Sequence, residues 1–524
     1  MRAVRARPEA AGIAPARTGV GLAAFDRPLL LFALVLTAIV LAYFWTPTDP
    51  DVWWHLRNGA VVATTGAVPH GDIYSYTVPG APWIMQQWLL ETIMYSIEQT
   101  LGYWANVLLF ALVSASVYTL LFGTLRAAGA GRPLAVGAVL VAVVLDAPTW
   151  GVRPQIWTTL FFVSFLAILL RYQRVGPDRW LLLLPPLMLL WANFHAGFSA
   201  GLLLLGAFIA GEAINRVLGW PAAPLWPLVA VTVACAAVSL LNPNGLDLWL
   251  YPITYLAGKG GNASLRFVQE WQPPDLRAIR GWPLAATLLG LLALNLLRRG
   301  PDPAPANPPA PRAAWGNAPL MLAIAGFTLM ALQAIRFTPL YAVVWTVVIA
   351  LRLVEIWPRL GRAAEAAPVP PEMLTQRRLF GRLNAGVYAV VALVLAVVIL
   401  GSPRAQVHAA PLESDYPAGA VAYLADNAAT LPAPLHLFHE YGWGGYLIAH
   451  HVPVFVDGRA DPYGNLLDDY VAASSGARWE PIFAAHGVNG VLVRTGAPLD
   501  KIIGTAPGWS LAYHDNLSVL YIKR

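Results

Sequence analysis

Residues 28–57 read PLLLFALVLTAIVLAYFWTPTDPDVWWHLR, and this stretch decides the fold class. Its first part, residues 28–45, is apolar and falls within the roughly 17–25 residues that a helix needs to cross a bilayer core of about 30 Å. Aspartates, tryptophans, a histidine and an arginine follow at once, a composition typical of the water-facing edge of a membrane. The stretch therefore predicts a membrane-spanning helix followed by a polar loop outside the bilayer.

The composition of the 524-residue chain extends this prediction to most of its length. Hydrophobic residues make up 57% of the chain and charged residues only 12%, whereas an average soluble domain has about 25% charged residues. This excludes an ordinary soluble enzyme and predicts a mainly α-helical, polytopic membrane protein. The single cysteine, Cys235, excludes a disulfide framework and a cysteine-based metal site. Eleven apolar segments are suitable transmembrane helices: 28–45, 103–124, 134–150, 154–171, 180–194, 198–218, 224–242, 282–298, 317–334, 337–355 and 385–402.

The basic residues orient these segments. With the N-terminus in the cytoplasm, the cytoplasmic segments and span ends hold twenty of the 34 Lys and Arg residues, and the outer loops hold seven. The positive-inside rule describes an excess of this kind on the cytoplasmic side. We therefore expect a multi-pass protein of the cytoplasmic (inner) cell membrane with its N-terminus inside. The net charge of +6 then reflects orientation and gives no reason to expect a nucleic-acid partner.

Three regions follow from this topology. Residues 1–27 are expected to form a cytoplasmic tail, residues 28–402 the transmembrane domain, and residues 403–524 an extracytoplasmic domain. In the last region short β-type runs alternate with helical stretches, which predicts a small α/β fold. The first outer loop, residues 46–102, includes a stretch, residues 83–101, whose glutamines, glutamates and aromatic residues suit a helix at the membrane interface. We therefore expect interfacial helices in this loop.

The first outer loop concentrates polar chemistry at the membrane surface. Asp49 and Asp51 follow the first span and precede Trp53 and Trp54. A carboxylate here could act as a general base on an incoming hydroxyl, and carboxylates with a histidine could hold a divalent cation against a phosphate. The alternative is structural, with the aspartates capping the next helix and the tryptophans anchoring it at the interface. The further polar residues of this loop that could bind a substrate are His55, Arg57, His70 and Asp72.

Three polar residues near later spans are predicted to lie at the same outer face. Arg153 begins one span and Arg336 lies between two others, both against the cytoplasmic bias of the basic residues. Each could bind a lipid-linked phosphate as a fixed cation, or could extend to the outer headgroups of the bilayer. His195 lies in an outer turn, either as a binding residue or as a hydrogen-bonded residue of the turn.

With these features the chain resembles the C-type (GT-C) superfamily of polytopic membrane glycosyltransferases. The superfamily combines a cytoplasmic N-terminus and about eleven or more spans with an acidic first outer loop, interfacial helices and often an outer C-terminal domain. The run DVWWHLR, residues 51–57, is similar to the first outer loop of oligosaccharyltransferase catalytic subunits. The run FHEYGWGGY, residues 438–446, is similar to their Trp-Trp-Asp-Tyr-Gly motif, with FHE in place of Trp-Trp-Asp. The chain is closest to bacterial members without an assigned activity.

The resemblance implies an enzyme that moves a sugar from a polyprenyl-phosphate-linked donor to an acceptor of unidentified kind at the outer face of the bilayer. It implies Asp51 as the catalytic base or metal ligand and Asp49 as the second choice. A Mg²⁺ or Mn²⁺ ion on Asp49, Asp51 and His55 is compatible with these residues but not required by them. The residues expected to bind substrate or lipid phosphate are His55, Arg57, His70, Asp72, Arg153, His195 and Arg336.

Two other classes of function are compatible with the same spans. A polytopic transporter or flippase for a lipid-linked or small substrate would carry ionisable residues near span centres and show related halves. Few such residues and no clear repeat are visible in the sequence. A non-catalytic membrane assembly protein would use its C-terminal domain to bind a partner. The chain has no Gly-rich phosphate loop, zinc signature or nucleophile elbow, so ATP-driven transport lacks local support.

Overall fold

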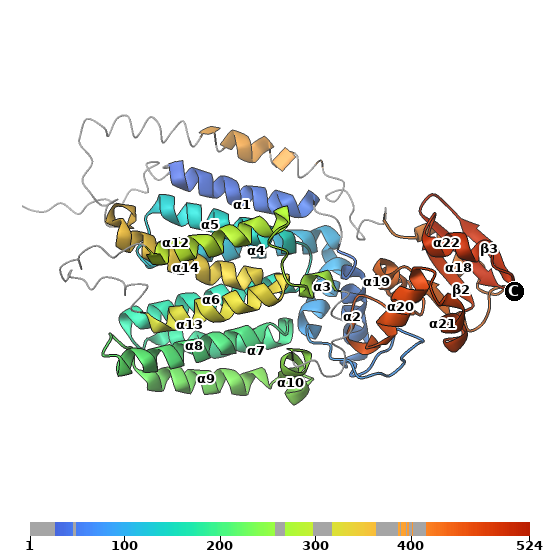
Figure 1. Cartoon of the computed structure of the whole chain (residues 1–524), viewed down its shortest axis with the longest axis horizontal. Coiled ribbons are helices and arrows are strands. Elements are labelled where there is room, and N and C mark those ends of the chain that lie inside the picture. Colours follow the sequence, from blue (N-terminus) through green and yellow to red (C-terminus); the bar gives the residue numbers. More distant parts are fainter. Residues whose placement is uncertain are drawn as a thin grey trace, which may run out of the picture.

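A bundle of helices forms the larger part of the protein (Figure 1). The structure, a computed structural model, describes residues 27–45, 49–256, 268–296, 317–362 and 415–524, together with short pieces between 386 and 401. In the described part of the chain, six helices are long and apolar enough to cross a membrane. They are α1 (Arg27–Trp45), α4 (Tyr103–Ala127), α5 (Arg132–Asp146) with the 3-10 turn that extends it (Ala147–Thr149), α6 (Gln155–Val175), α8 (Phe198–Val217) and α14 (Thr338–Ile356) with the preceding 3-10 turn (Ile335–Phe337).

Four shorter apolar helices run beside these six (Figure 1). Helix α13 packs against α8 and α14, α7 against α9, and α12 against α5 and α14. A helix thus occupies ten of the eleven predicted segments, which gives the architecture of a multi-pass membrane protein. In the segment 385–402 the described residues between 386 and 397 are helical but interrupted by gaps, so the number of crossings stays a prediction. The shorter helices are α7 (Leu184–Phe194), which follows a 3-10 turn (Arg179–Leu183), α9 (Leu225–Ser239), α12 (Trp282–Leu296) and α13 (Ala318–Gln333).

Two helices of the first loop lie across the end of the bundle that faces the C-terminal region (Figure 1). They are α2 (Val52–Thr65) and α3 (Trp88–Leu101), and they pack against each other. Gly59 makes this approach close, because a Cβ atom at its position would lie 2.1 Å from the carbonyl oxygen of Glu91. Each helix has 14 residues, too few to cross a bilayer core. Their predicted place at the membrane interface agrees with this length and stays a prediction.

The C-terminal region is an α/β unit, as the alternating pattern predicts. Its sheet has the order β1-β2-β4-β3, with β1 parallel to β2 and the other two pairs antiparallel. The strands are β1 (Leu437–His439), β2 (Gly490–Arg494), β3 (Trp509–His514) and β4 (Ser518–Lys523). The helices are α18 (Ala418–Asp426), α19 (Gly444–Ala449), α20 (Leu466–Ser474), α21 (Trp479–Ala485) and α22 (Pro498–Ile503).

The first loop and the C-terminal unit are joined by backbone pairing. The β-type run at residues 453–456 is not a strand of the sheet but pairs with the first loop. The Val454 N–H donates to the Tyr74 carbonyl at 3.2 Å, and the Tyr76 N–H donates to the Val454 carbonyl at 3.2 Å. Helix α19 also packs on α2. The first loop and the C-terminal unit therefore form an interface of hydrogen bonds and packed helices at the end of the bundle.

The tryptophans of the first loop belong to this interface. Trp53 and Trp54 are only 4% and 6% exposed. The Trp53 ring packs edge-on against Tyr416 and Tyr446 of the C-terminal region, with ring centres 5.2 and 4.8 Å apart. The expectation that these tryptophans anchor the loop in lipid headgroups is therefore wrong, because protein side chains cover them. One apolar core runs from the bundle through these rings into the C-terminal unit.

Candidate functional site

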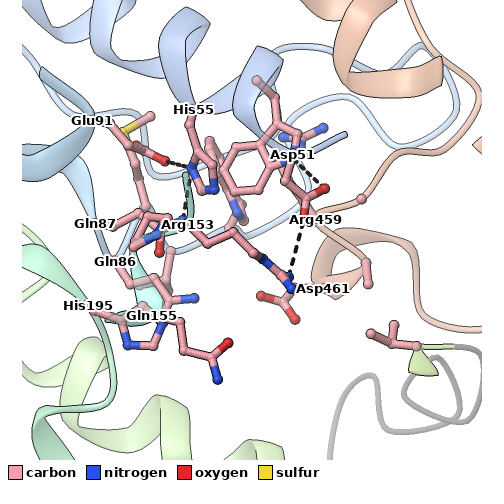
Figure 2. A pocket seen from close by; sticks show the side chains of 18 of the residues that line it. Asp51, His55, Gln86, Gln87, Glu91, Arg153, Gln155, His195, Arg459 and Asp461 are labelled. Atoms are coloured by element: carbon pink, nitrogen blue, oxygen red, sulfur yellow. Dashed lines mark hydrogen bonds and ion pairs between the residues drawn. The ribbon is translucent and has the colours of Figure 1, made fainter. Parts of the chain in front are cut away.

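A polar cavity of about 110 Å³ lies where the bundle, the first loop and the C-terminal unit meet (Figure 2). Its walls come from the start of α2, the segment before α3, the start of α6, the turn between α7 and α8, the loop before α12, the turn before α14, and residues 458–461. The sequence places these segments far apart, so only the fold brings them together. The predicted site residues that line the cavity are Asp51, His55, Arg153, His195 and Arg336.

Asp51 lies at the N-terminus of α2, but its side chain does not cap the helix. Its Oδ1 accepts a hydrogen bond from Trp54 Nε1 at 3.0 Å, and its backbone N–H donates to Asp49 Oδ1 at 2.9 Å. The side chain is 25% exposed. Burial, and next to it the negative charge of Asp49, raises the pKa of Asp51 to about 6. The capping alternative is therefore wrong for Asp51, which instead offers a carboxylate that titrates near neutral pH.

Gly458 of the C-terminal unit sets how closely the chain approaches this carboxylate. A Cβ atom at Gly458 would lie 2.1 Å from Asp51 Oδ1 and 3.5 Å from Trp54 Nε1. Real carbon and oxygen atoms cannot come so close, so only glycine fits here without displacing Asp51. Gly445 likewise lies against the Pro50 carbonyl, 2.6 Å from where its Cβ would be. The C-terminal unit thus supports the position of Asp51.

Two of the arginines that line the cavity, Arg153 and Arg336, share one carboxylate. Arg153 Nη2 lies 3.0 Å from Glu270 Oε2, and Arg336 Nη1 lies 3.5 Å from Glu270 Oε1. The Arg153 guanidinium also contacts both aspartates, with Nε 2.9 Å from Asp49 Oδ2 and Nη2 3.8 Å from Asp51 Oδ2. Burial alone would raise the pKa of Glu270, but Arg336 and Arg153 outweigh it and hold that pKa below its usual value. Glu270 is therefore an anion bound between two cations.

The stacking of Arg336 fixes its guanidinium plane. It lies over the ring of Trp271, 4.1 Å from the ring centre. A cation over an aromatic face is stabilised by the ring electrons. The structure thus brings Arg153 and Arg336 together at Glu270, and each guanidinium has protein partners instead of extending only to headgroups. Their role as phosphate ligands stays a proposal.

His55 is held by a buried carboxylate that the sequence analysis did not single out. Its Nδ1 lies 2.7 Å from Glu91 Oε1 and 3.1 Å from Gln87 Nε2. Asn58 Nδ2 donates to the same Glu91 oxygen at 3.1 Å, and Glu91 is 0% exposed. Glu91 Oε2 has no hydrogen-bond partner in the described structure. The signal that could have identified Glu91 is a charged residue in an otherwise apolar helix face.

His195 is a neutral hydrogen-bonding group. Burial, followed by the positive charge of Arg336, lowers its pKa to about 3. Its Nδ1 accepts the backbone N–H of Gly197 at 3.0 Å and lies 2.9 Å from Thr158 Oγ1. Because Nδ1 is an acceptor, the proton of the neutral ring is on Nε2. His195 therefore brings an N–H donor, and not a charge, to the wall of the cavity.

Three predicted binding residues do not line the polar cavity. Arg57 lies on α2 away from it, and His70 is exposed in a turn. Asp72 is 2% exposed and lies 2.6 Å from Arg459 Nη2, so its carboxylate is already used between the first loop and the C-terminal unit. The structure therefore does not bring these three residues to the cavity that Asp51 lines, and their role in binding substrate stays a prediction.

The expected metal ligands Asp49, Asp51 and His55 have protein partners in the structure. Across the described parts of the chain, no group of three or more His, Cys, Asp or Glu side chains is arranged to hold a metal ion. Asp49 faces Arg153, and the His55 Nδ1 atom is paired with Glu91. Asp49 and the Nδ1 atom of His55 are thus engaged with protein partners, and the role of the three residues as metal ligands stays a prediction.

Two further cavities adjoin the polar one. The apolar cavity, about 410 Å³, shares Gln86, Gln155, His195 and Arg336 with it and is otherwise lined mainly by apolar side chains. The outer cleft, about 760 Å³, shares Asp51, Arg153 and Glu270 with it, and Asp49, Tyr441 and Gly442 also line it. The apolar lining includes Leu202, Leu203, Ile253, Met330 and Leu340. The polar cavity thus lies between an apolar space and a wider polar cleft.

The C-terminal unit contributes two charged residues to the polar cavity, Arg459 and Asp461 (Figure 2). Asp461 Oδ2 accepts a hydrogen bond from Tyr251 Oη at 2.7 Å. Tyr251 belongs to α10 (Gly245–Leu256), in the long loop between α9 and α12. Arg459 and Asp461 lie in an Asp-Gly-Arg-Ala-Asp run whose polarity is visible in the sequence. This run lies about four hundred residues after Asp51, so the sequence alone does not indicate that they line the same cavity.

Among solved structures, the apo oligosaccharyltransferase of Archaeoglobus fulgidus is similar to this chain, with a TM-score of 0.50 and 15% sequence identity. The similarity covers 90% of this chain and 70% of that one. The chain has a GT-C-like fold. No protein-family model and no curated protein sequence matches it.

Two other similar structures have lower scores. The A. fulgidus enzyme in complex with Zn and sulfate gives a TM-score of 0.48 at 14% identity, over 88% of this chain and 68% of that one. ArnT from Cupriavidus metallidurans bound to undecaprenyl phosphate gives 0.45 at 14% identity, over 94% and 97%. Similarity at such identities concerns the GT-C-like fold alone, and the chemistry of this chain follows from its own cavity.

Proposed function

We propose that the chain is a membrane glycosyltransferase that moves a sugar from a polyprenyl-phosphate-linked donor to an acceptor at the outer face of the cytoplasmic membrane. One observation carries the proposal: the Asp51 carboxylate shares a cavity with Arg153 and Arg336, beside an apolar space. Such a cavity has the base, the cations and the lipid-compatible wall that transfer from a lipid phosphate requires. The GT-C-like fold supports the same class of reaction by analogy.

The donor lipid fits the boundary between two cavities. Arg336 and His195 line both the polar and the apolar cavity. A lipid phosphate at this boundary would meet a guanidinium and a neutral N–H donor, while its isoprenoid chain would lie among Leu202, Ile253 and Leu340. The sugar would then extend from the phosphate into the polar cavity. The apolar part of the donor would then lie in the apolar cavity, and its polar part would lie in the polar cavity.

Glu270 supports the assignment of the phosphate site. Its carboxylate lies between Arg153 and Arg336, where an anionic phosphate would make the same ion pairs. A protein carboxylate between two guanidinium groups shows that their geometry suits an oxyanion. We infer that the donor phosphate displaces Glu270 when it binds. The two cations would then stabilise the negative charge that builds up on the departing phosphate.

Asp51 is the proposed general base, with Asp49 in support. The acceptor hydroxyl would approach from the outer cleft, which Asp49 and Asp51 line together with Arg153. Asp51 takes the proton of the acceptor hydroxyl as its oxygen bonds to the anomeric carbon of the sugar. The bond from that carbon to the phosphate oxygen breaks at the same time, and the polyprenyl phosphate leaves with the electron pair. Direct displacement needs no covalent enzyme intermediate.

The proposed attack of the acceptor hydroxyl does not require a divalent cation. Asp49 and Asp51 could supply two carboxylate ligands, but Arg153 already lies against both of them. The guanidinium brings positive charge to the place where a Mg²⁺ or Mn²⁺ ion would bring it. The described residues fit a guanidinium-held pair of aspartates better than a three-ligand metal site.

The test is turnover by the Asp51→Asn variant. Purified protein in nanodiscs is given a labelled polyprenyl-phosphate-linked sugar and a membrane extract as the source of acceptor, and the release of free polyprenyl phosphate is measured. We expect Asp51→Asn to abolish release while the matched variant Asp178→Asn keeps it, since Asp178 pairs with Arg171 at the other end of the bundle. Equal release by wild type and Asp51→Asn would refute the role of Asp51. Movement of intact donor across the bilayer without release would support a flippase instead.

A further inference from the structure

Arg459 joins the C-terminal unit to the first loop and lies at the wall of the polar cavity. Its side chain is 1% exposed, and its Nη2 lies 2.6 Å from both Asp72 Oδ1 and Asp457 Oδ2. The Nε atom donates to Asp457 Oδ1 at 2.8 Å, and Tyr463 Oη lies 3.0 Å from Nη2. The guanidinium thus forms ion pairs with two carboxylates, one from the first loop and one from the C-terminal unit.

Aromatic rings hold the plane of this guanidinium. It lies 4.7 Å from the ring centre of Trp83 and 4.9 Å from that of Tyr74, both from the first loop. Trp83 also lines the polar cavity. Because the ion pairs and the rings fix the group from several sides, its remaining N–H bonds keep a constant direction.

One nitrogen of Arg459 is left without a partner. In the described structure, Nη1 is buried and makes no hydrogen bond, while Nε and Nη2 are fully used. Buried charged donors are rarely left unpaired, because the loss of hydration is then not compensated. Arg459 lines the polar cavity but neither the apolar cavity nor the outer cleft. Arg459 therefore belongs to the wall of the polar cavity alone, and Nη1 is the nitrogen of its guanidinium that no described protein group uses.

The charge on this wall selects against an anionic ligand. The one positive charge of Arg459 is already paired with two buried carboxylates, Asp72 and Asp457, and Asp461 adds a further carboxylate to the lining of the cavity. Asp461 is further linked to Tyr251, and Gln86 Nε2 lies 3.4 Å from Tyr251 Oη. Neutral hydroxyl groups can both donate to and accept from such a wall, while a ligand carboxylate would meet a net negative field. An aromatic ring beside polar groups also suits the mixed faces of a sugar.

We propose that Arg459, with Trp83 and Asp461, forms the recognition wall for the sugar of the donor, and that this sugar is uncharged and hydroxyl-bearing, not a uronic acid. The inference rests on the proposed glycosyltransferase function. It makes the C-terminal unit part of the donor site. The site is then complete only when the first loop and the C-terminal unit are docked together.

The first experiment compares ligands on the unaltered protein. Synthetic short-chain polyprenyl phosphates carrying glucose, galactose or mannose, their three uronic acid counterparts and the bare polyprenyl phosphate are the probes, and dissociation constants are measured in nanodiscs. At least one neutral sugar should bind about tenfold more tightly than its uronate. Equal or tighter binding of the uronates would overturn the inference. Failure of every probe, the bare phosphate included, would instead contradict the proposed function.

The second experiment separates the sugar from the phosphate. Arg459→Lys keeps the charge between the two carboxylates but loses the extra N–H donors of the guanidinium. We expect it to weaken the tightest neutral sugar probe about tenfold and to leave the bare phosphate unchanged, whereas Arg336→Gln should weaken both. Tyr463→Phe is the matched control, since it removes a partner of Arg459 outside the cavity. An equal loss with Arg459→Lys and Tyr463→Phe, or a loss for the bare phosphate, would assign Arg459 a purely structural role.

Discussion

Two buried polar clusters lie at opposite ends of the bundle and differ in how completely their hydrogen bonds are made. At the end away from the C-terminal unit, Glu212 is 0% exposed and accepts from Gln173 Nε2 at 2.7 Å and from the Ala223 N–H at 2.8 Å. Gln173 and Asn317 exchange hydrogen bonds of 3.0 and 3.1 Å. This cluster ties α6, α8 and α13 together.

The cluster around the polar cavity is not closed in this way. Glu91 Oε2 and Arg459 Nη1 are buried without partners in the described structure, and Asp51 has a raised pKa. None of the side chains of Glu212, Gln173 or Asn317 has such an unpartnered buried atom. Buried polarity alone therefore does not mark a functional site. A closed network holds helices together, while open polar atoms around a cavity are available to a ligand.

The largest expected effect is the contrast between one substitution in each cluster, Asp51→Asn at the cavity and Glu212→Gln in the closed network. Asp51→Asn should lower turnover by about two to four orders of magnitude, as expected for loss of a general base, with an unchanged melting temperature. Glu212→Gln should keep turnover but lower stability by about 1–3 kcal/mol, because a carboxylate with several donors is replaced by an amide. Turnover and thermal unfolding of both purified variants check this. A loss of turnover with Glu212→Gln at full stability would erase the contrast between the clusters.

A smaller effect is expected where the C-terminal unit approaches the base. Gly458→Ala would place a Cβ atom 2.1 Å from the present position of Asp51 Oδ1, so Asp51 has to move. We expect turnover to fall roughly tenfold or more, because misplacement of a catalytic group by about 1 Å is costly. Gly326→Ala on α13 is the control, since nothing lies within 4 Å of its Cβ position. Equal turnover in both variants would show that the contact at Gly458 does not matter.

The raised pKa of Asp51 gives a dependence on pH. The base works as the carboxylate, so turnover should be full well above pH 6, half-maximal near the pKa of about 6, and lost as the pH falls further. The charge of Asp49 contributes to the raised pKa, so Asp49→Asn should lower it and move the acid limb to lower pH. The pH profile of kcat/KM for the wild-type protein and for Asp49→Asn measures the position of this limb. A limb that moves to higher pH in Asp49→Asn would contradict the assignment.

The smallest expected effect concerns the carboxylate between the two arginines. Glu270→Gln removes the anion that the donor phosphate has to displace, so bare polyprenyl phosphate should bind a few-fold more tightly. Calorimetry or native mass spectrometry in nanodiscs measures the change. Weaker binding would mean that Glu270 assists the ligand instead of competing with it.

Much of the fold could be predicted because hydropathy reports burial in a membrane directly. Apolar runs located ten described helices, and the distribution of Arg and Lys put Asp51, Arg153, His195 and Arg336 on one side. The structure brings these four residues to one cavity. A single orientation rule was sufficient here, because residues at the same end of a bundle have little room to separate.

The rest depends on contacts that hydropathy does not encode. Glu91 lies in a stretch whose polarity indicated only an interfacial helix, yet it packs inward against His55. Asp72 was grouped with Asp51 by proximity in sequence, but it pairs with Arg459 from the far end of the chain. Trp53 shows the same limit, because an apolar side chain fits equally well against lipid or under a protein domain. Contacts between residues hundreds of positions apart form only when the C-terminal unit docks on the first loop.

The most direct test of the central claim is an experimental structure of the protein with undecaprenyl phosphate in a nanodisc. We expect the phosphate beside Arg336 and His195, the isoprenoid chain in the apolar cavity, and Glu270 moved away from the two arginines. A lipid phosphate bound elsewhere on the bundle, with Glu270 still between Arg153 and Arg336, would contradict it.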